Sequence, residues 1–223
     1  AIVAATGNSD IIFGIENVKG TAFDDSIVGD SSANSLIGGA GNDTLNGLGG
    51  NNVLDGGAGS DTLISLGGND TLNGGSESDT VDYSSLTGVS FSSDDLTAGK
   101  VNGIYYDGIK VDLTNSSEQR IHSAYGSDTL ISIENIIGST RADYIVGNDQ
   151  INILDGKGGN DYFVLGQGVD TILGDAGIDT ISFSETSRTL GINVDLNKNQ
   201  TYGSTDSYRV ISDGFGNAKY LDS

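Results

Sequence analysis

Several residue types are missing from this 223-residue chain, which has no cysteine, proline, methionine or tryptophan and a single histidine. Without cysteine the chain forms no disulfides and offers no thiolate metal ligands. The HExxH motif of zinc proteases is absent, and nothing near His122 marks a nucleophile elbow for a catalytic triad. No apolar run is long enough to span a bilayer, and no secretory signal peptide is present. We therefore expect no catalytic residues and no membrane insertion.

Basic residues are scarce as well. Ten Lys and Arg stand against 31 Asp and Glu, which gives a net charge of −21. This charge repels phosphates, so neither nucleic acid nor an anionic membrane is an expected partner. An acid excess is typical of a solvated surface or a disordered chain. Adjacent acids such as Asp24 and Asp25, or Asp94 and Asp95, also suggest glycosidase chemistry, which needs paired carboxylates.

What the chain does have is a period of nine residues. One bulky apolar residue recurs in each nonad, at Ile27, Leu36, Leu45, Leu54, Leu63, Leu72 and Val81. Two positions before each of these lies Asp or Asn, at Asp25, Asn34, Asp43, Asn52, Asp61, Asp70 and Asp79. Six of the seven nonads begin with glycine, and Ser65 is the exception. Counted from that first residue, the Asp or Asn is position six and the apolar residue is position eight. Acids confined to one phase of a repeat argue against disorder, and the repeat already explains Asp25.

The best-formed nonad, GGAGNDTLN at residues 38–46, combines a turn with a very short strand. Its glycines allow positive φ angles and bring backbone carbonyls close to a common centre. Asp43 adds a carboxylate, and a hard cation such as Ca²⁺ takes about six to eight oxygens of these kinds. Thr44, Leu45 and Asn46 alternate polar, apolar and polar, which predicts a strand with one inward side chain. Metal-free hairpins are disfavoured, because they need longer flanking strands.

The nonads resemble the GGxGxDxUx repeat of RTX (repeats-in-toxin, haemolysin-type calcium-binding) proteins. This resemblance implies an all-β fold, a right-handed parallel β-roll in which two nonads form one coil and Ca²⁺ lies between stacked turns. It implies several calcium ions and no other cofactor. The ligand positions that it implies in the first array are Asp25, Asn34, Gly38, Gly39, Ala40, Gly41, Asp43, Gly50, Asn52, Gly56, Gly57, Ala58, Gly59, Asp61, Gly68, Asp70, Gly74 and Asp79.

A second array continues the same frame from Gly138. Its position-eight residues are Ile145, Leu154, Phe163, Ile172 and Ile181. The ligand positions implied there are Asp143, Asn152, Gly156, Gly158, Gly159, Asp161, Gly168, Asp170, Gly174, Ala176, Gly177 and Asp179. A shift of 118 residues overlays the arrays, so that Asp10 falls on Asp128 and Asp43 on Asp161. The chain is thus nearly two copies of one unit, and we expect a segment of a longer tandem array.

This organisation predicts six segments. Residues 1–19 are a lead-in coil, 20–82 the first array, 83–127 an irregular β segment, 128–137 a second lead-in, 138–182 the second array and 183–223 a truncated irregular β segment. Within residues 83–127, Tyr105, Tyr106 and Tyr125 suit either packing or a small carbohydrate-binding surface, and we favour packing.

Alternate nonads place their sixth residues on opposite edges of the coil. One edge carries Asp25, Asp43, Asp61 and Asp79, and the other carries Asn34, Asn52 and Asp70. The second array repeats the difference, with Asp143, Asp161 and Asp179 against Asn152 and Asp170. Ligand charge is a main control on calcium affinity. We therefore predict tight binding on the all-Asp edge and weak or partial binding on the other.

Composition predicts that folding depends on calcium. The chain has 35 glycines and 35% hydrophobic residues, so its core is thin against a large chain entropy. The favoured function is a calcium-binding extender of a large secreted bacterial surface protein or adhesin. That parent protein would contact cell-surface or extracellular polysaccharide elsewhere, and this segment is expected to be a monomer. The alternative is an accessory module of an extracellular protease, lipase, or polysaccharide epimerase or lyase. Ice binding is disfavoured, because position three of the first array contains no Thr.

Overall fold

The computed structural model describes residues 2–5, 8–11, 14–86, 100–101, 104–122, 124–166, 168, 170–182, 208–212 and 218–222. These residues form strands, turns and bends, and none of them is helical. Accordingly, no helix in the part described has the length and apolarity to cross a membrane. Contacts divide the chain into a first unit, residues 1–83 and 115–133, and a second unit, residues 84–114 and 134–223. Asp94 and Asp95 lie outside the described residues.

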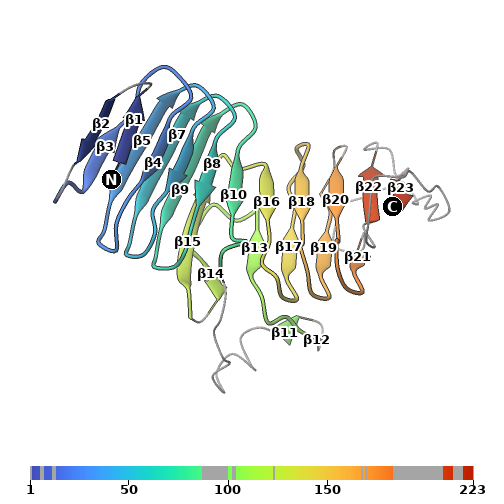
Figure 1. Cartoon of the computed structure of the whole chain (residues 1–223). Coiled ribbons are helices and arrows are strands. Elements are labelled where there is room, and N and C mark those ends of the chain that lie inside the picture. Colours follow the sequence, from blue (N-terminus) through green and yellow to red (C-terminus); the bar gives the residue numbers. More distant parts are fainter. Residues whose placement is uncertain are drawn as a thin grey trace. The chain divides into compact units, whose positions relative to one another are not determined.

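The first unit contains two parallel sheets whose strands alternate along the chain (Figure 1). One sheet has the order β4 (Ser26–Val28), β6 (Thr44–Asn46), β8 (Thr62–Ile64) and β10 (Thr80–Asp82). The other begins with β3 (Asn17–Lys19), β5 (Ser35–Ala40), β7 (Val53–Ala58) and β9 (Thr71–Ser76). Strands β1 (Ile2–Ala5) and β2 (Asn8–Ile11) pair antiparallel. Paired residues are 18 apart in sequence, as in Thr44 and Thr62, so two nonads make one coil.

The position-eight side chains fill the interior of the first unit, as predicted. Their exposed fractions fall from 5% at Ile27 to 1% at Leu36 and 0% at Leu45, Leu54, Leu63, Leu72 and Val81. The residues on either side of each point outward, because successive side chains of a strand face opposite ways. One large apolar residue per strand therefore forms a single continuous column of core.

The chain leaves the first array after β10 and returns to it. Strand β15 (Gly126–Ile131) pairs parallel with β9, and β14 (Gln119–His122) pairs antiparallel with β15. Thr129 and Leu130 lie opposite Thr71 and Leu72, in the places that residues 89 and 90 would take in an uninterrupted repeat. Residues that follow a long excursion thus supply the next strand of the sheet.

The second unit has the same alternation of strands. One sheet contains β16 (Asn135–Ile137), β18 (Ile153–Asp155) and β20 (Thr171–Leu173) in parallel, followed by the antiparallel strands β22 (Tyr208–Ser212) and β23 (Ala218–Asp222). The other contains β13 (Lys110–Asp112), β17 (Tyr144–Val146), β19 (Tyr162–Val164) and β21 (Thr180–Ser182), all parallel. A hairpin joins β11 (Lys100–Val101) to β12 (Ile104–Tyr105). Ile145, Leu154, Phe163 and Ile172 are buried, whereas Ile181 is only partly so.

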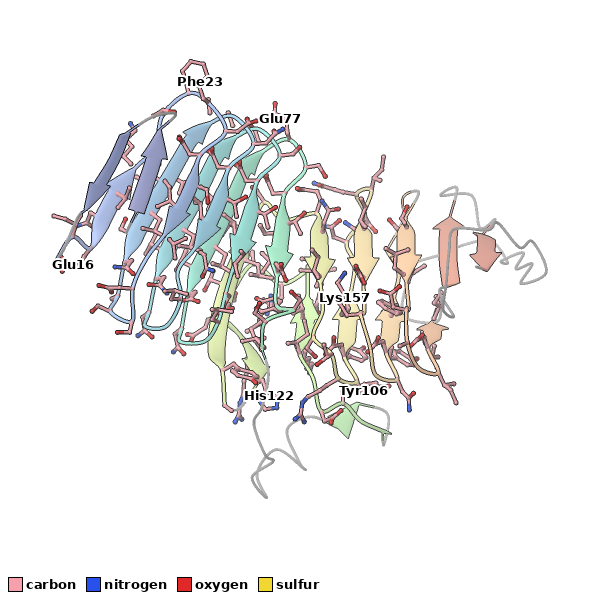
Figure 2. All side chains as sticks on the ribbon, in the orientation of Figure 1. Glu16, Phe23, Glu77, Tyr106, His122 and Lys157 are labelled. Carbon is pink, nitrogen blue, oxygen red and sulfur yellow. The ribbon has the colours of Figure 1, made fainter. Side chains whose placement is uncertain are left out.

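A second apolar cluster lies on the outer face of strands β17 and β19. Tyr144 and Tyr162 stack with ring centroids 5.5 Å apart, and Tyr106 packs against both at 5.5 and 5.9 Å. Val164 completes the buried part of this cluster. Tyr106, labelled in Figure 2, is 8% exposed. The packing role favoured for Tyr106 from sequence is what the structure shows, while the Tyr105 side chain lies outside the described residues.

The two units do not coincide with the six segments drawn from the repeats, because residues 115–133 group with the first array. The segments describe the sequence period, and their boundaries stay a prediction.

Candidate metal-binding turns

The turns between strands fall on two edges of each unit. We call aspartate edge the turns at residues 20–25, 38–43, 56–61 and 74–79, and at 138–143, 156–161 and 174–179. We call asparagine edge the turns at residues 29–34, 47–52 and 65–70, and at 147–152 and 165–170. Phe23 and Glu77, from the first and last aspartate-edge turns of the first unit, lie along the same side of it (Figure 2).

Position-six side chains of the interior turns tie two coils together. The Oδ1 atom of such a side chain accepts a hydrogen bond from the backbone N–H of the position-six residue one coil earlier. On the aspartate edge, Asp25 donates to Asp43 at 2.7 Å, Asp43 to Asp61 at 2.7 Å and Asp61 to Asp79 at 2.8 Å. In the second unit, Asp143 donates to Asp161 at 2.8 Å and Asp161 to Asp179 at 3.0 Å. One carboxylate oxygen of each acceptor is thereby used by the fold itself.

The position-one glycines explain why the second oxygen stays close to backbone carbonyls. A Cβ on Gly38 would collide with Asp43 Oδ2 and lie 2.7 Å from the Gly56 carbonyl oxygen. A Cβ on Gly56 would meet Asp61 Oδ2 and the Gly74 carbonyl oxygen in the same way. Only glycine leaves room at these points. Carboxylate and carbonyl oxygens from two successive coils therefore gather beside each of these glycines.

Four of these carboxylate oxygens are buried without a hydrogen-bond donor: Oδ2 of Asp43, Asp61, Asp161 and Asp179. A buried ionised oxygen without a partner is costly, by about 1–3 kcal/mol or more. Neighbouring carbonyls cannot relieve this cost, because they are acceptors too. A cation that binds oxygen is the partner that meets both needs, and the donor set of carboxylate plus carbonyls suits Ca²⁺.

Two position-six residues depart from this pattern. Asp25 Oδ2 accepts hydrogen bonds from Thr21 N at 2.6 Å and Thr21 Oγ1 at 2.9 Å. Asp143 is bound on both oxygens, by Ser139 N at 2.7 Å and by Ser139 Oγ and Ile109 N, each at 2.7 Å. These residues stand in the first turn of their rows, where the array begins. In these first turns, hydroxyl and backbone N–H groups donate hydrogen bonds to carboxylate oxygens that have no donor in the interior turns.

Burial and like charge raise the pKa values of these carboxyls. Burial raises the pKa of Asp43 and Asp61, and the nearby charge of Asp25 acts on Asp43 as Asp43 acts on Asp61. In the second unit, burial together with the charges of Asp143 and Asp179 raises the pKa of Asp161 to about 8. A row of aspartates 18 residues apart thus disfavours its own ionisation, and a bound cation reverses that preference.

Position two separates the aspartate edges of the two units. Gly39, Gly57 and Gly75 have φ angles of 125°, 109° and 110°, which side-chain-bearing residues rarely adopt. Lys157 and Asp175 occupy the same position in the second unit with φ of 64° and 57°, in the left-handed helical region. Lys157 Nζ also forms a 2.8 Å ion pair with Asp155.

The asparagine edge is organised differently, through residues that the repeat did not single out. Asp128 occupies position six of the returning strand β15, and its Oδ1 accepts the Asp70 N–H at 3.0 Å. Its Oδ2 accepts the hydroxyl of Tyr83 at 2.9 Å, and Ser65 Oγ lies 3.2 Å from it and 3.0 Å from Asp70 Oδ2. Two signals pointed to this group: Ser65 breaks the position-one glycine rule, and Asp128-Thr129-Leu130 repeats the Asp-Thr-Leu of residues 61–63.

A family model for the RTX calcium-binding nonapeptide repeat matches residues 5–45, 19–54, 46–81, 133–162 and 146–181. These matches cover more than half of the chain and both arrays. The chain belongs to the RTX calcium-binding repeat family. Comparison with curated proteins finds no match.

Membership of the RTX family confirms the predicted fold, a calcium-binding β-roll. The RTX repeat is a structural module and not a catalytic fold, and such repeats are typical of secreted bacterial proteins. Among the described residues, no group of three or more His, Cys, Asp or Glu side chains could hold a metal ion. A calcium site among these residues would need backbone carbonyl oxygens in addition to carboxylates.

Proposed function

We propose that this chain is a calcium-gated extender of a large secreted bacterial surface protein or adhesin, which folds when it meets Ca²⁺ outside the cell. One observation carries the proposal: Oδ2 atoms of successive aspartates on the aspartate edge are buried beside carbonyls without donors. At low calcium this row opposes folding. At high calcium the same row supplies binding free energy to the folded state alone.

The residues that would hold calcium are the aspartates of the aspartate edge and the glycine-rich turns before them. In the first array these are Asp43 with residues 38–41, Asp61 with residues 56–59, and Asp79 with Gly74. In the second they are Asp161 with Gly156, Gly158 and Gly159, and Asp179 with Gly174, Ala176 and Gly177. Calcium supplies positive charge between coils and needs no proton transfer.

The mechanical role follows from where the ions would sit. Each coil adds two large inward side chains, so hydrophobic burial between coils is limited. A cation shared between turns 18 residues apart would join successive coils directly. Bound calcium would then stiffen the stack against local opening, which suits a segment that positions a ligand-binding domain elsewhere in its parent.

The test compares the purified chain in EDTA, in millimolar Ca²⁺ and in millimolar Mg²⁺. We expect Ca²⁺ to restore β-sheet circular dichroism that EDTA abolishes, and Mg²⁺ to substitute poorly because it demands tight octahedral geometry. Small-angle scattering should show an elongated monomer with Ca²⁺ and a swollen coil without it. Structure unaffected by chelation would overturn calcium gating. A compact globule in Ca²⁺ would instead favour the accessory module of an extracellular enzyme.

A further inference from the structure

The buried polar atoms without hydrogen-bond partners are of opposite kinds on the two edges of the first unit. On the aspartate edge the buried atoms without partners are carboxylate oxygens, Asp43 Oδ2 and Asp61 Oδ2. On the asparagine edge the corresponding atom is Asn34 Nδ2, an amide donor. Asn34 Oδ1 is already engaged, because it accepts the Asp30 N–H at 2.8 Å. An acceptor without a donor attracts a cation, whereas an N–H group without an acceptor repels one.

The amide of Asn52 takes the place of a cation in the next turn. Its Nδ2 donates to the carbonyl oxygens of Gly49 and Gly50 at 3.5 and 3.3 Å. These carbonyls belong to the turn that would otherwise present oxygens to a metal. Asn52 Oδ1 accepts the Asn34 N–H at 2.9 Å, as an aspartate Oδ1 does on the other edge. One side chain therefore keeps the bond between coils and also covers the carbonyls.

In the second unit the side-chain amide of Asn152 is also engaged, but with different partners. Its Nδ2 donates to the Glu134 carbonyl oxygen at 2.8 Å and to Asn148 Oδ1 at 3.0 Å. Its Oδ1 accepts the Asn148 N–H at 2.9 Å. Asn152 is fully buried, so no water replaces these partners. An amide nitrogen therefore meets oxygen acceptors at position six of this edge in both units, through different contacts.

The last coil of this edge in the first unit contains carboxylates, but hydroxyls satisfy them. Asp70 and Asp128 are 3% and 1% exposed, and Ser65 and Tyr83 are 2% and 0% exposed. Each carboxylate uses Oδ1 for a backbone N–H and Oδ2 for a hydroxyl. Ser65 stands where the aspartate edge requires glycine, and its side chain fills the space beside Asp70 Oδ2 that glycine leaves open there.

We propose that in the first unit calcium binds along the aspartate edge only, and that the asparagine edge of this unit is a metal-free seam held by side-chain amides and hydroxyls. The inference rests on the calcium binding proposed above and assigns its location. For the first unit it narrows the sequence-based prediction of weak calcium binding on the asparagine edge to no binding, and it names Asn52 and Ser65 as the residues that exclude the ion. The aspartate edge would then bind the calcium on which folding depends, while in the folded chain the seam holds the coils in register through side-chain hydrogen bonds alone.

The test is a reciprocal exchange of Asp and Asn in the whole chain, read as calcium ions bound per chain by equilibrium dialysis. Asp61→Asn puts an amide on the aspartate edge and is expected to lower the number of ions. Asn52→Asp frees the Gly49 and Gly50 carbonyls, adds a carboxylate and is expected to raise it. Asn52→Ala, which removes the amide without adding charge, is expected to leave the number unchanged while lowering the melting temperature in calcium.

Each result decides the proposal. An equal loss of ions in Asn52→Ala and Asp61→Asn would overturn it, because both edges would then bind calcium. An Asn52→Asp variant that gains no ion would overturn the assignment of the amide as the excluding group. Ser65→Gly gives a second measurement if Asn52 variants fold poorly: it removes the hydroxyl that donates to Asp70 Oδ2, so we expect the number of bound ions to rise, and an unchanged number would count against the seam. A wild-type chain that binds no calcium would instead defeat the proposed function.

Discussion

The two arrays hold their coils together with different amounts of apolar packing. In the strands that follow the aspartate-edge turns, the first residue points outward. It is Thr44, Thr62 and Thr80 in β6, β8 and β10 of the first array, and Tyr144 and Tyr162 in β17 and β19 of the second. The tyrosines form a buried cluster with Tyr106 outside the sheet. The threonines face outward and are partly exposed. The second array therefore has two apolar layers across these strands, where the first has one.

This difference bears on how strongly the stability of each array depends on bound calcium. A coil with one core column buries little apolar surface, so bound calcium would contribute a larger share of its stability. A coil with added aromatic packing tolerates less regular turns. Lys157 and Asp175 stand at the position that Gly39, Gly57 and Gly75 hold in the first array, and these two residues belong to the array with the additional layer.

Calcium removal should have the largest effect and should affect the two arrays unequally. Each site filled at about 100 times its Kd contributes about 2.7 kcal/mol, and several such sites match the whole stability of a typical domain. We expect chelation at neutral pH to unfold the first array fully, while strands β17 and β19 keep residual amide protection. Hydrogen exchange resolved by segment measures this. Equal amide protection in both arrays would show that the tyrosine cluster adds no stability in the absence of calcium.

Removing the tyrosine cluster should lower the free energy of unfolding of the second array. Tyr144→Ala is expected to cost about 3–5 kcal/mol, as truncation of a buried aromatic usually does. Thr62→Ala is the matched control, because Thr62 holds the same position of the repeat in the first array. We expect the control to change stability by less than about 0.5 kcal/mol. Unfolding in urea at saturating calcium compares the two, and equal costs would contradict the layer's role.

Exchanging position two should show which turns demand glycine. Gly57→Lys is expected to cost about 1–3 kcal/mol or more, because φ is 109° and a Cβ would collide with the Gly39 carbonyl oxygen. Lys157→Gly relieves a left-handed backbone at the expense of one ion pair, so we expect a change within about 1 kcal/mol. Thermal melting in calcium measures both. Similar losses in the two variants would mean that φ at this position is not what distinguishes the turns.

A further comparison concerns pH. In the calcium-free chain, burial raises the pKa of Asp161 to about 8 and of Asp143 and Asp128 to about 7, against about 3.9 when unfolded. The folded state therefore holds more protons, so its stability is greatest below about pH 4 and falls as pH rises through 7 to 8. Saturating calcium should reverse this trend, because only the ionised carboxylates bind it. Melting temperatures of the dialysed chain between about pH 5 and 8, with and without calcium, give the sign, and the same sign in both conditions would contradict this explanation.

Much of the site was predictable because its parts are local. Position six, position eight and the turn glycines lie within nine residues of each other, so periodicity alone located Asp43, Leu45 and the carbonyls around them. The split into an aspartate and an asparagine edge followed from counting alternate nonads. Hydrogen bonds between residues 18 apart then confirmed the stacking of turns that the coil implied.

What the sequence could not reveal is which distant segments complete each array. Ser65 and Asp128 are 63 residues apart, and Ile109 reaches Asp143 across 34. The nine-residue period sets the shape of a coil but says nothing about where an interrupted sheet finds its next strand, since any segment with a matching strand and position-six acceptor competes for that edge. Tertiary packing made that choice through the hydroxyls of Ser65 and Tyr83, whose partners are defined only once the chain has returned.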